Sequence, residues 1–167
     1  MLIVLSGLPG SGKTTVARAL TARAGAVHLR MDTVEQALVD SGHETHPVSP
    51  AGYYVLRALA GDLLRQGHTV VADSVNPLTI TRETWREVAR EAGVGFREVE
   101  VVCSDVAQHE RRVRERVGDI AGLPLPTWED VQAVEFEPWD GNRLVVDTAT
   151  EAVAAAVERV LEGSTRP

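Results

Sequence analysis

A glycine-rich segment near the N-terminus, Gly7-Leu-Pro-Gly-Ser-Gly-Lys13-Thr14, constrains the fold most, because it fits the pattern G-x-x-x-x-G-K-[ST]. An unbroken apolar run, residues 2–5, precedes the segment, and an amphipathic helical pattern over residues 12–24 follows it. Glycines in this setting let consecutive backbone N–H groups turn inward around an anion, and the N-terminal end of the next helix adds its positive dipole. The sequence therefore predicts a strand, a phosphate-binding loop and a helix in direct succession.

The loop predicts which residues hold a nucleotide and a metal ion. We expect Lys13 to reach the β- and γ-phosphates of ATP, and the Thr14 hydroxyl to bind Mg²⁺. Asp73 ends another apolar run and is expected either to hold the same Mg²⁺ through water or to contact the phosphoryl acceptor. The predicted ATP-binding residues of the loop are Gly7, Gly10, Ser11, Gly12, Lys13, Thr14 and Thr15.

Apolar runs that suit strands alternate five times with segments that suit helices. Such alternation predicts an α/β fold with a parallel sheet that is covered on both faces and binds ligands at the carboxyl ends of its strands. The expected strands are residues 2–5, 27–29, 69–72, 96–102 and 144–146. Because the sequence contains no repeat or linker, we expect a single domain over residues 1–167.

Three helices have recognisable starting patterns. Asn76-Pro77 is typical of an N-cap followed by proline at the first helical position. Thr127 and Asp130 fit a capping box, and Thr148 with Glu151 fits another cap.

The composition excludes several classes of phosphate-loop protein. Lys13 is the only lysine among 17 basic residues. A guanine-specific GTPase would need a second lysine in its Asn-Lys-x-Asp motif. ATPase motors and AAA machines usually carry a Glu after the Asp that ends the strand, where this chain has Ser74. These exclusions favour a small phosphotransferase whose acceptor is a substrate hydroxyl rather than water.

Charge and cysteine content indicate the setting. A formal net charge of −7 disfavours binding to nucleic acid, which is driven by neutralisation of phosphates. Cys103 is the only cysteine, so no internal disulfide can form and a reducing cytoplasm is expected. No apolar run is long enough to span a bilayer, and the sequence does not indicate an oligomeric state.

Asp32 directly follows the second expected strand and so faces the expected γ-phosphate cleft. Its carboxylate could accept the proton of an attacking hydroxyl, and we favour this role over the alternative, an N-cap of the next helix. Arg30 is as well suited to bind an anionic group of the acceptor as to lie on the surface. Arg57 and Arg82 are further candidates for binding substrate anions.

An arginine-rich stretch places Arg112 and Arg116 on one face of an expected helix over 106–117. A guanidinium group can stack on a base or bind phosphate with two N–H groups. We expect Arg114 instead to pair with Glu110 on the surface. Glycines and prolines around 118–126 indicate a mobile lid after this helix.

Together these residues resemble the small P-loop kinases related to adenylylsulfate kinase, chloramphenicol phosphotransferase, gluconate kinase and polynucleotide 5′-kinase. The resemblance covers most of the chain and rests on the loop Gly7–Thr14, on Asp32 and Asp73, on the helix with Arg112 and Arg116, and on the last strand. It implies a three-layer α/β/α P-loop NTPase fold with a five-stranded parallel sheet of order 2-3-1-4-5. It also implies a small arginine-bearing lid over about residues 112–127.

The resemblance implies roles for individual residues. Arg112 would stack on adenine, Arg116 would contact phosphates, Asp32 would act as general base, and residues 147–149 would lie near the adenine. The Asn-Ile-Arg-Arg substrate segment and the lysine-bearing lid of adenylylsulfate kinase are absent.

The combined expectation is an ATP- and Mg²⁺-dependent kinase that transfers the γ-phosphoryl group to a hydroxyl of a small molecule. Lys13, Asp32 and Arg116 are its expected catalytic residues. Two alternatives remain open. One is a kinase of nucleotide or nucleic-acid 5′-hydroxyl groups, and the other is a nucleotide-binding switch without an acceptor.

Overall fold

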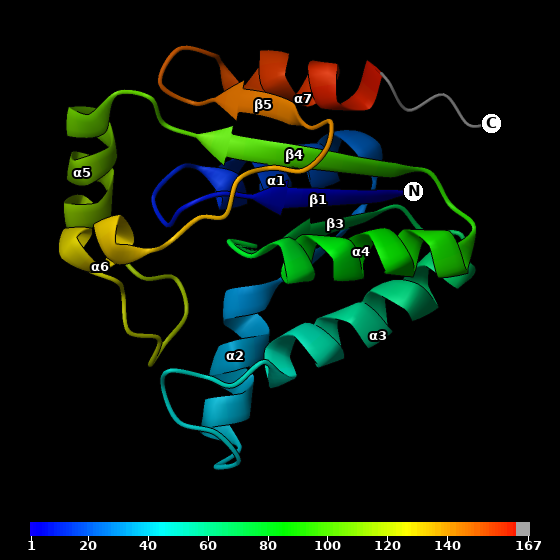
Figure 1. The fold of residues 1–167 in the computed structure, drawn as a ribbon, viewed down its shortest axis with the longest axis horizontal. Coiled ribbons are helices and arrows are strands. Elements are labelled where there is room, and N and C mark those ends of the chain that lie inside the picture. Colours follow the sequence, from blue (N-terminus) through cyan, green and yellow to red (C-terminus); the bar gives the residue numbers. More distant parts are fainter. Residues whose placement is uncertain (163–167) are drawn as a thin grey trace.

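The computed structural model describes residues 1–162, which are built around a five-stranded parallel sheet with the order β2-β3-β1-β4-β5 (Figure 1). The predicted class and strand order are confirmed. The strands are β1 (Leu2–Ser6), β2 (Val27–Arg30), β3 (Val70–Asp73), β4 (Phe96–Val102) and β5 (Leu144–Asp147). The helices are α1 (Lys13–Ala24), α2 (Met31–Asp40), α3 (Ala51–Arg65), α4 (Thr79–Ala92), α5 (Val106–Glu115), α6 (Trp128–Ala133) and α7 (Val153–Glu162). Residues 163–167 of the predicted domain lie outside the described residues.

The central strand β1 is buried along its whole length, which explains its unbroken apolar sequence. Its side chains alternate between two cores, because successive residues of a strand point to opposite faces. Ile3 and Leu5 pack with residues of α1 and α7 on one face. Leu2 and Val4 pack with residues of α3 and α4 on the other face. The sheet is therefore the middle of three layers.

All five strands end at the same edge of the sheet because they are parallel. The loop after β1 lies at this edge, and α5 and α6 stand beside it (Figure 1). Strand register brings two predicted site residues to the edge, since Leu5 of β1 is level with Asp73 of β3, which is level with Arg30 of β2. Within residues 1–162, no helix is long and apolar enough to cross a membrane.

Two of the predicted helix caps are wrong. Helix α4 begins at Thr79, and Asn76 lies in a left-handed conformation (φ 49°) before it. The fully buried Asn76 amide instead donates to Ser6 Oγ at 3.0 Å, and its oxygen accepts from Trp85 Nε1 at 3.2 Å. Helix α7 begins at Val153, too late for a Thr148 cap.

The third predicted cap is confirmed. Thr127 Oγ1 accepts from the Asp130 backbone N–H at 3.1 Å, and Asp130 Oδ2 accepts from the Thr127 backbone N–H at 2.9 Å. The two bonds satisfy free N–H groups at the start of α6.

Candidate active site

The glycine-rich loop takes a backbone shape that only glycine fits. Gly7, Gly10 and Gly12 have φ values of 146°, 80° and 101°. A Cβ atom on Gly7 would lie 2.1 Å from the carbonyl oxygen of Val101, and one on Gly10 would lie 2.5 Å from Val113 Cγ2. The loop is therefore packed against β4 and α5, in the wrapped form that presents N–H groups to an anion.

Two polar side chains in the loop fit a phosphate ligand. Ser11 Oγ is buried and has no hydrogen-bond partner within the described part of the chain. The Lys13 side chain is buried, and its Nζ donates to the Leu8 carbonyl oxygen at 3.0 Å. Burial lowers the pKa of Lys13, while the charges of Asp73 and Asp32 oppose this effect. A buried cation whose one hydrogen bond within the described residues goes to a carbonyl is well placed to bind phosphate oxygens.

Thr14 and Asp73 are brought together, as the metal-site prediction requires. Thr14 Oγ1 donates to Asp73 Oδ2 at 2.8 Å, and His28 Nε2 lies 3.2 Å from the same oxygen. Burial acts to raise the pKa of Asp73, but the bond from His28, the charge of Lys13 and the bond from Thr14 together lower it. Asp73 is thus an ionised, oriented carboxylate beside a threonine hydroxyl, a pair of hard oxygen ligands that suits Mg²⁺.

Asp32 lies in the first turn of α2, and Arg30 occupies the N-cap position before it. The alternative that Asp32 caps this helix is therefore wrong. Its carboxylate accepts from Arg30 Nη2 at 3.0 Å and lies 3.6 Å from Arg116 Nη2. Asp32 also acts on the pKa of Lys13 through its charge. The structure thus gathers four predicted site residues at one edge of the sheet.

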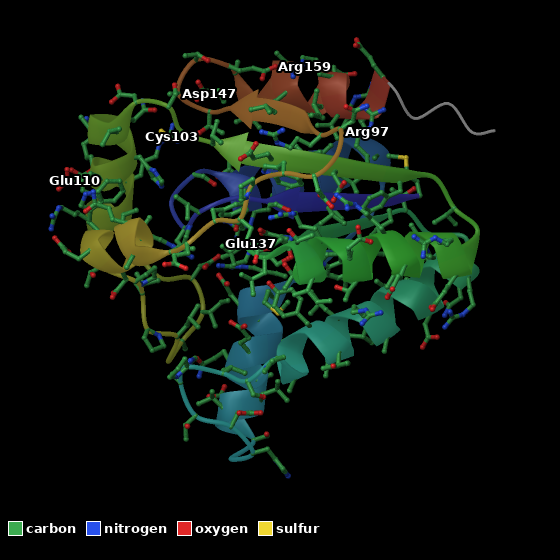
Figure 2. All side chains as sticks on the ribbon, viewed as in Figure 1. Arg97, Cys103, Glu110, Glu137, Asp147 and Arg159 are labelled. Atoms are coloured by element: carbon green, nitrogen blue, oxygen red, sulfur yellow. The ribbon has the colours of Figure 1, made fainter. Side chains whose placement is uncertain are left out.

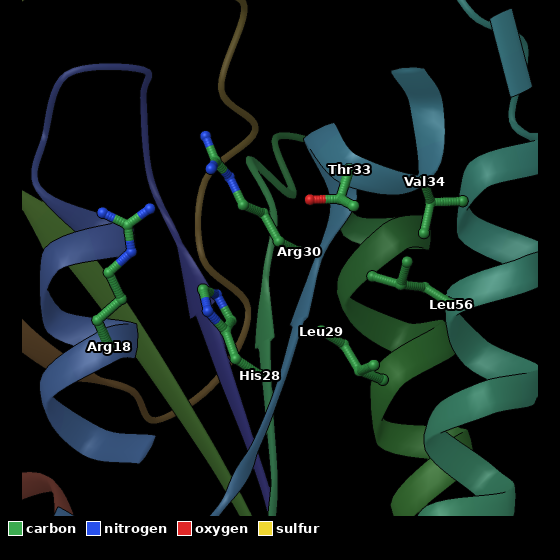
Figure 3. Close-up of a pocket in the computed structure, with 7 residues that line it drawn as sticks. All are labelled: Arg18, His28, Leu29, Arg30, Thr33, Val34 and Leu56. Atoms are coloured by element: carbon green, nitrogen blue, oxygen red, sulfur yellow. The ribbon is translucent and has the colours of Figure 1, made fainter. Parts of the chain in front are cut away.

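A cavity of about 310 Å³ opens beside these residues along strand β2 (Figure 3). Arg18, His28 and Arg30 lie on one side of the strand, and Leu29, Val34 and Leu56 lie on the other. The cavity is lined by both charged and apolar side chains, and its volume is at the lower end of the range of ligand pockets.

Glu35, three residues after Asp32, adds an unpredicted acid to this region. Burial, and next the charge of Asp32, raise the pKa of Glu35 from 4.5 to about 7. The nearby Tyr53 has its pKa raised to about 12, mainly by burial. Helix α3 approaches Glu35 closely through Gly52, where an added Cβ would lie 3.2 Å from Glu35 Cγ.

Arg112 lies at the far side of the loop, where it contacts Thr148. Arg112 Nη1 donates to Thr148 Oγ1 at 2.7 Å, and Nη2 donates to the Thr148 carbonyl oxygen at 3.0 Å. Thr148 Oγ1 in turn donates to the carbonyl oxygen of Ser11 at 2.7 Å. Thr148 follows Asp147, which lies near Cys103 at neighbouring strand ends (Figure 2). The end of the sheet thus supports the loop through one hydroxyl.

His109 supports the loop from α5. Its Nε2 lies 2.8 Å from the Pro9 carbonyl oxygen, and because a carbonyl can only accept, Nε2 carries the proton. The ring packs edge-on against Trp128 of α6. Elsewhere on α5 the predicted surface pair is present, with Arg114 Nε donating to Glu110 Oε1 at 2.8 Å.

Two predicted substrate residues lie apart from this group. Arg57 pairs with Glu87 of α4 at 3.4 Å, on the outer helices. Arg82 is fully buried and stacks on Trp139, with its guanidinium carbon 4.6 Å from the ring centre. Its Nη1 and Nη2 atoms donate to the chain itself, at the oxygens of Asn76, Pro77, Glu137 and Pro138 and at Thr79 Oγ1, while its buried Nε has no partner within residues 1–162.

Sequence reasoning missed His28, Glu35 and Asp119 as members of the site. His28 precedes Arg30 by two residues, and Glu35 follows Asp32 by three, so strand and helix periodicity could have indicated both. Asp119 accepts from Arg30 Nη1, although the two lie 89 residues apart. No local pattern could have indicated that contact.

The fold is shared with solved structures that include two kinases. At 21% identity and a TM-score of 0.71, the chain matches the APS kinase CysC of Mycobacterium tuberculosis in complex with AMPPNP and APS, covering 96% of this chain and 95% of that one. A gluconokinase of Sinorhizobium meliloti matches at 22% identity and a TM-score of 0.65, covering 96% and 89%. Kti12 of Chaetomium thermophilum in complex with ADP-AlF3 matches at 21% identity and a TM-score of 0.68, covering 99% and 100%.

A search of curated proteins finds no match. The profile of a family described as AAA domain matches residues 2–138, most of the chain. This description was not expected, because Ser74 stands where AAA machines usually carry a Glu. The chain has the fold of the small P-loop kinases, and it belongs to the family described as AAA domain.

Proposed function

We propose that the protein is an ATP- and Mg²⁺-dependent kinase that phosphorylates a hydroxyl of a small molecule. The observation that carries the proposal is the position of Asp32. Its carboxylate lies at the carboxyl edge of the sheet, close enough to Lys13 to act on its pKa, and is paired with Arg30 and Arg116. A carboxyl group beside a phosphate-binding loop suits proton abstraction from an attacking hydroxyl.

The remaining site residues have separate roles in this proposal. The backbone of Gly7–Thr15 and the Ser11 hydroxyl hold the phosphates, and Lys13 and Arg116 neutralise charge on the transferring group. Thr14 and Asp73 would hold Mg²⁺, which neutralises phosphate charge when bound. Arg112 would flank the adenine, and residues 112–127 would form the arginine-bearing lid. The proposed setting is the cytoplasm, where ATP is available.

Two variants test the proposal. Asp32→Asn keeps the shape of the side chain but cannot accept the proton, so we expect loss of phosphoryl transfer with nearly unchanged affinity for AMPPNP. Asp40→Asn, an exposed change in the same helix, is the control and should keep full activity. Lys13→Ala should abolish nucleotide binding or turnover. Unchanged turnover in Asp32→Asn, or normal binding and turnover in Lys13→Ala, would contradict the proposal.

The acceptor can be sought with the wild-type protein. Hydroxylated metabolites and antibiotics are screened for ADP release, and the product is then identified by mass spectrometry. The likeness to Kti12, seen with ADP-AlF3, gives weight to the alternative of a nucleotide-binding protein without a small acceptor. That alternative predicts slow ATP hydrolysis that no metabolite accelerates.

A further inference from the structure

Arg30 is a nearly buried cation with two carboxylate partners and one vacant donor. Its side chain is 10% exposed. Nη2 donates to Asp32, and Nη1 donates to Asp119 Oδ1 and Oδ2 at 3.0 and 2.9 Å. Its Nε atom is buried and has no hydrogen-bond partner within residues 1–162. The guanidinium group therefore retains an unpaired N–H group at Nε, beside the two atoms that bind carboxylates.

Asp119 reaches Arg30 from residues 116–127, a segment between α5 and α6 without helix or strand. The Asp119 side chain is 41% exposed. Its carboxylate also accepts from Arg18 Nη2 of α1, so it sits between two arginines. The pair with Arg18 is exposed on both sides and contributes little to stability. The pair with the nearly buried Arg30 is the stronger one, and an anion that binds the same two arginines would compete directly with Asp119.

Departure of Asp119 would leave a local excess of positive charge. The basic residues near the site would then outnumber the acidic ones. The basic residues are Lys13, Arg18, Arg30 and Arg116, and the acidic ones are Asp32 and Asp73, with Glu35 nearby. The nearly buried Arg30 would keep its bond to Asp32, but its Nη1 atom would lose both bonds to Asp119, so another anion should take the place of Asp119. The cavity beside β2, which both Arg18 and Arg30 line, adjoins this position (Figure 3).

We propose that the phosphoryl acceptor is itself anionic, and that its carboxylate or phosphate group binds Arg30 and Arg18 where Asp119 now lies. This inference rests on the proposed function, because it assigns a feature of the acceptor. One guanidinium group spans Asp32 and Asp119, so the anionic group and the hydroxyl near Asp32 are only a few bonds apart. The acceptor class is thus a small hydroxy acid or a phosphorylated alcohol.

The test measures binding of simple anions while the phosphate loop is filled. With AMPPNP and Mg²⁺ at saturation, inorganic phosphate and acetate are titrated separately by calorimetry into wild type and Asp119→Asn. We expect Asp119→Asn to bind at least one anion about tenfold more tightly, because one competing charge is gone. The two titrations distinguish a phosphate-bearing from a carboxylate-bearing acceptor.

Further variants separate a site from a general effect of charge. Asp62→Asn removes an equal charge from an exposed pair with Arg65 and should leave anion binding unchanged. Adding Arg30→Gln to Asp119→Asn should cancel the gain. If that double variant fails to fold, Arg18→Gln serves instead, since Arg18 is 63% exposed. The inference is overturned if Asp119→Asn binds the two anions no more tightly than Asp62→Asn does. It is also overturned if the gain in anion affinity persists after Arg30→Gln, or after Arg18→Gln where that variant is used instead.

The result is independent of catalysis. AMPPNP is not turned over, so calorimetry reports the anion site even if the protein transfers no phosphoryl group. Loss of turnover in Asp32→Asn tests the proposed kinase activity separately.

Discussion

Replacement of Arg82 by methionine should destabilise the protein strongly without affecting nucleotide binding. Arg82 lies between α4 and the segment before β5, and it is 0% exposed. It therefore contacts neither solvent nor the candidate active site. Methionine keeps the apolar stem and removes the guanidinium group. Five oxygen atoms then lose a bond from Arg82, three of them at 2.9 to 3.1 Å, and the Pro77 oxygen keeps its bond from the Glu137 backbone N–H.

The size of the effect follows from these contacts. Hydrogen bonds to a charged group contribute about 1.5–3 kcal/mol each, but neighbouring bonds are not additive. A buried acceptor left without its donor costs about 1–3 kcal/mol, and because several are left we expect a loss of about 3–5 kcal/mol for Arg82→Met. In a protein of this size the loss corresponds to a fall in Tm of roughly 10 °C.

Urea unfolding followed by far-UV circular dichroism measures the free energy of unfolding without relying on the nearby Trp139. Arg90→Met is the matched control, since Arg90 is exposed in the same helix, and its expected change is within about 0.5 kcal/mol. AMPPNP affinity should be unchanged in both variants at low temperature. A loss below about 1 kcal/mol for Arg82→Met would refute this reasoning, and a raised acceptor KM at normal stability would restore Arg82 as a substrate residue.

Two other substitutions test the site. Glu35→Gln should raise the free energy of unfolding at pH 8 by about 1–2 kcal/mol, after allowance for partial exposure, because a carboxyl with a raised pKa destabilises the folded state as pH rises from 4.5 to about 7. The gain should vanish towards pH 4 in urea titrations, and a gain independent of pH would contradict it. Gly10→Ala should weaken AMPPNP binding at least about tenfold by calorimetry, because its Cβ would meet Val113 and the loop must shift. Gly25→Ala, which also has positive φ but open space around it, should keep full affinity, and equal affinities would contradict the prediction.

The local sequence was enough to predict those parts of the fold that depend on the residues of the segment itself. The loop Gly7–Thr14 needs its own glycines for its backbone shape, and the strands need their own apolar residues for burial. Asp32 and Asp73 could be placed because each follows a strand, and parallel strands end at one edge. The roles of these residues stay predictions that the variants above test.

The wrong expectations share a different cause. Asn76 has the sequence context of a cap, yet contacts with Ser6 and Trp85 hold it in the core before the helix begins. Thr148 likewise fits a cap, but its hydroxyl bonds to the carbonyl of Ser11. In both cases partners distant in sequence satisfy the polar group better than the adjacent helix could.

By itself, the sequence determined the phosphate loop, the alternation of strands and helices, and the edge of the sheet at which the chemistry must lie. Only the tertiary structure decided which charged residues meet there. It buried Arg82 under the segment before β5 and brought Asp119 to Arg30 across 89 residues. The physical reason is that backbone shape and periodic burial depend on neighbours in sequence, whereas the pairing of a charge depends on whichever opposite charge folding brings within reach.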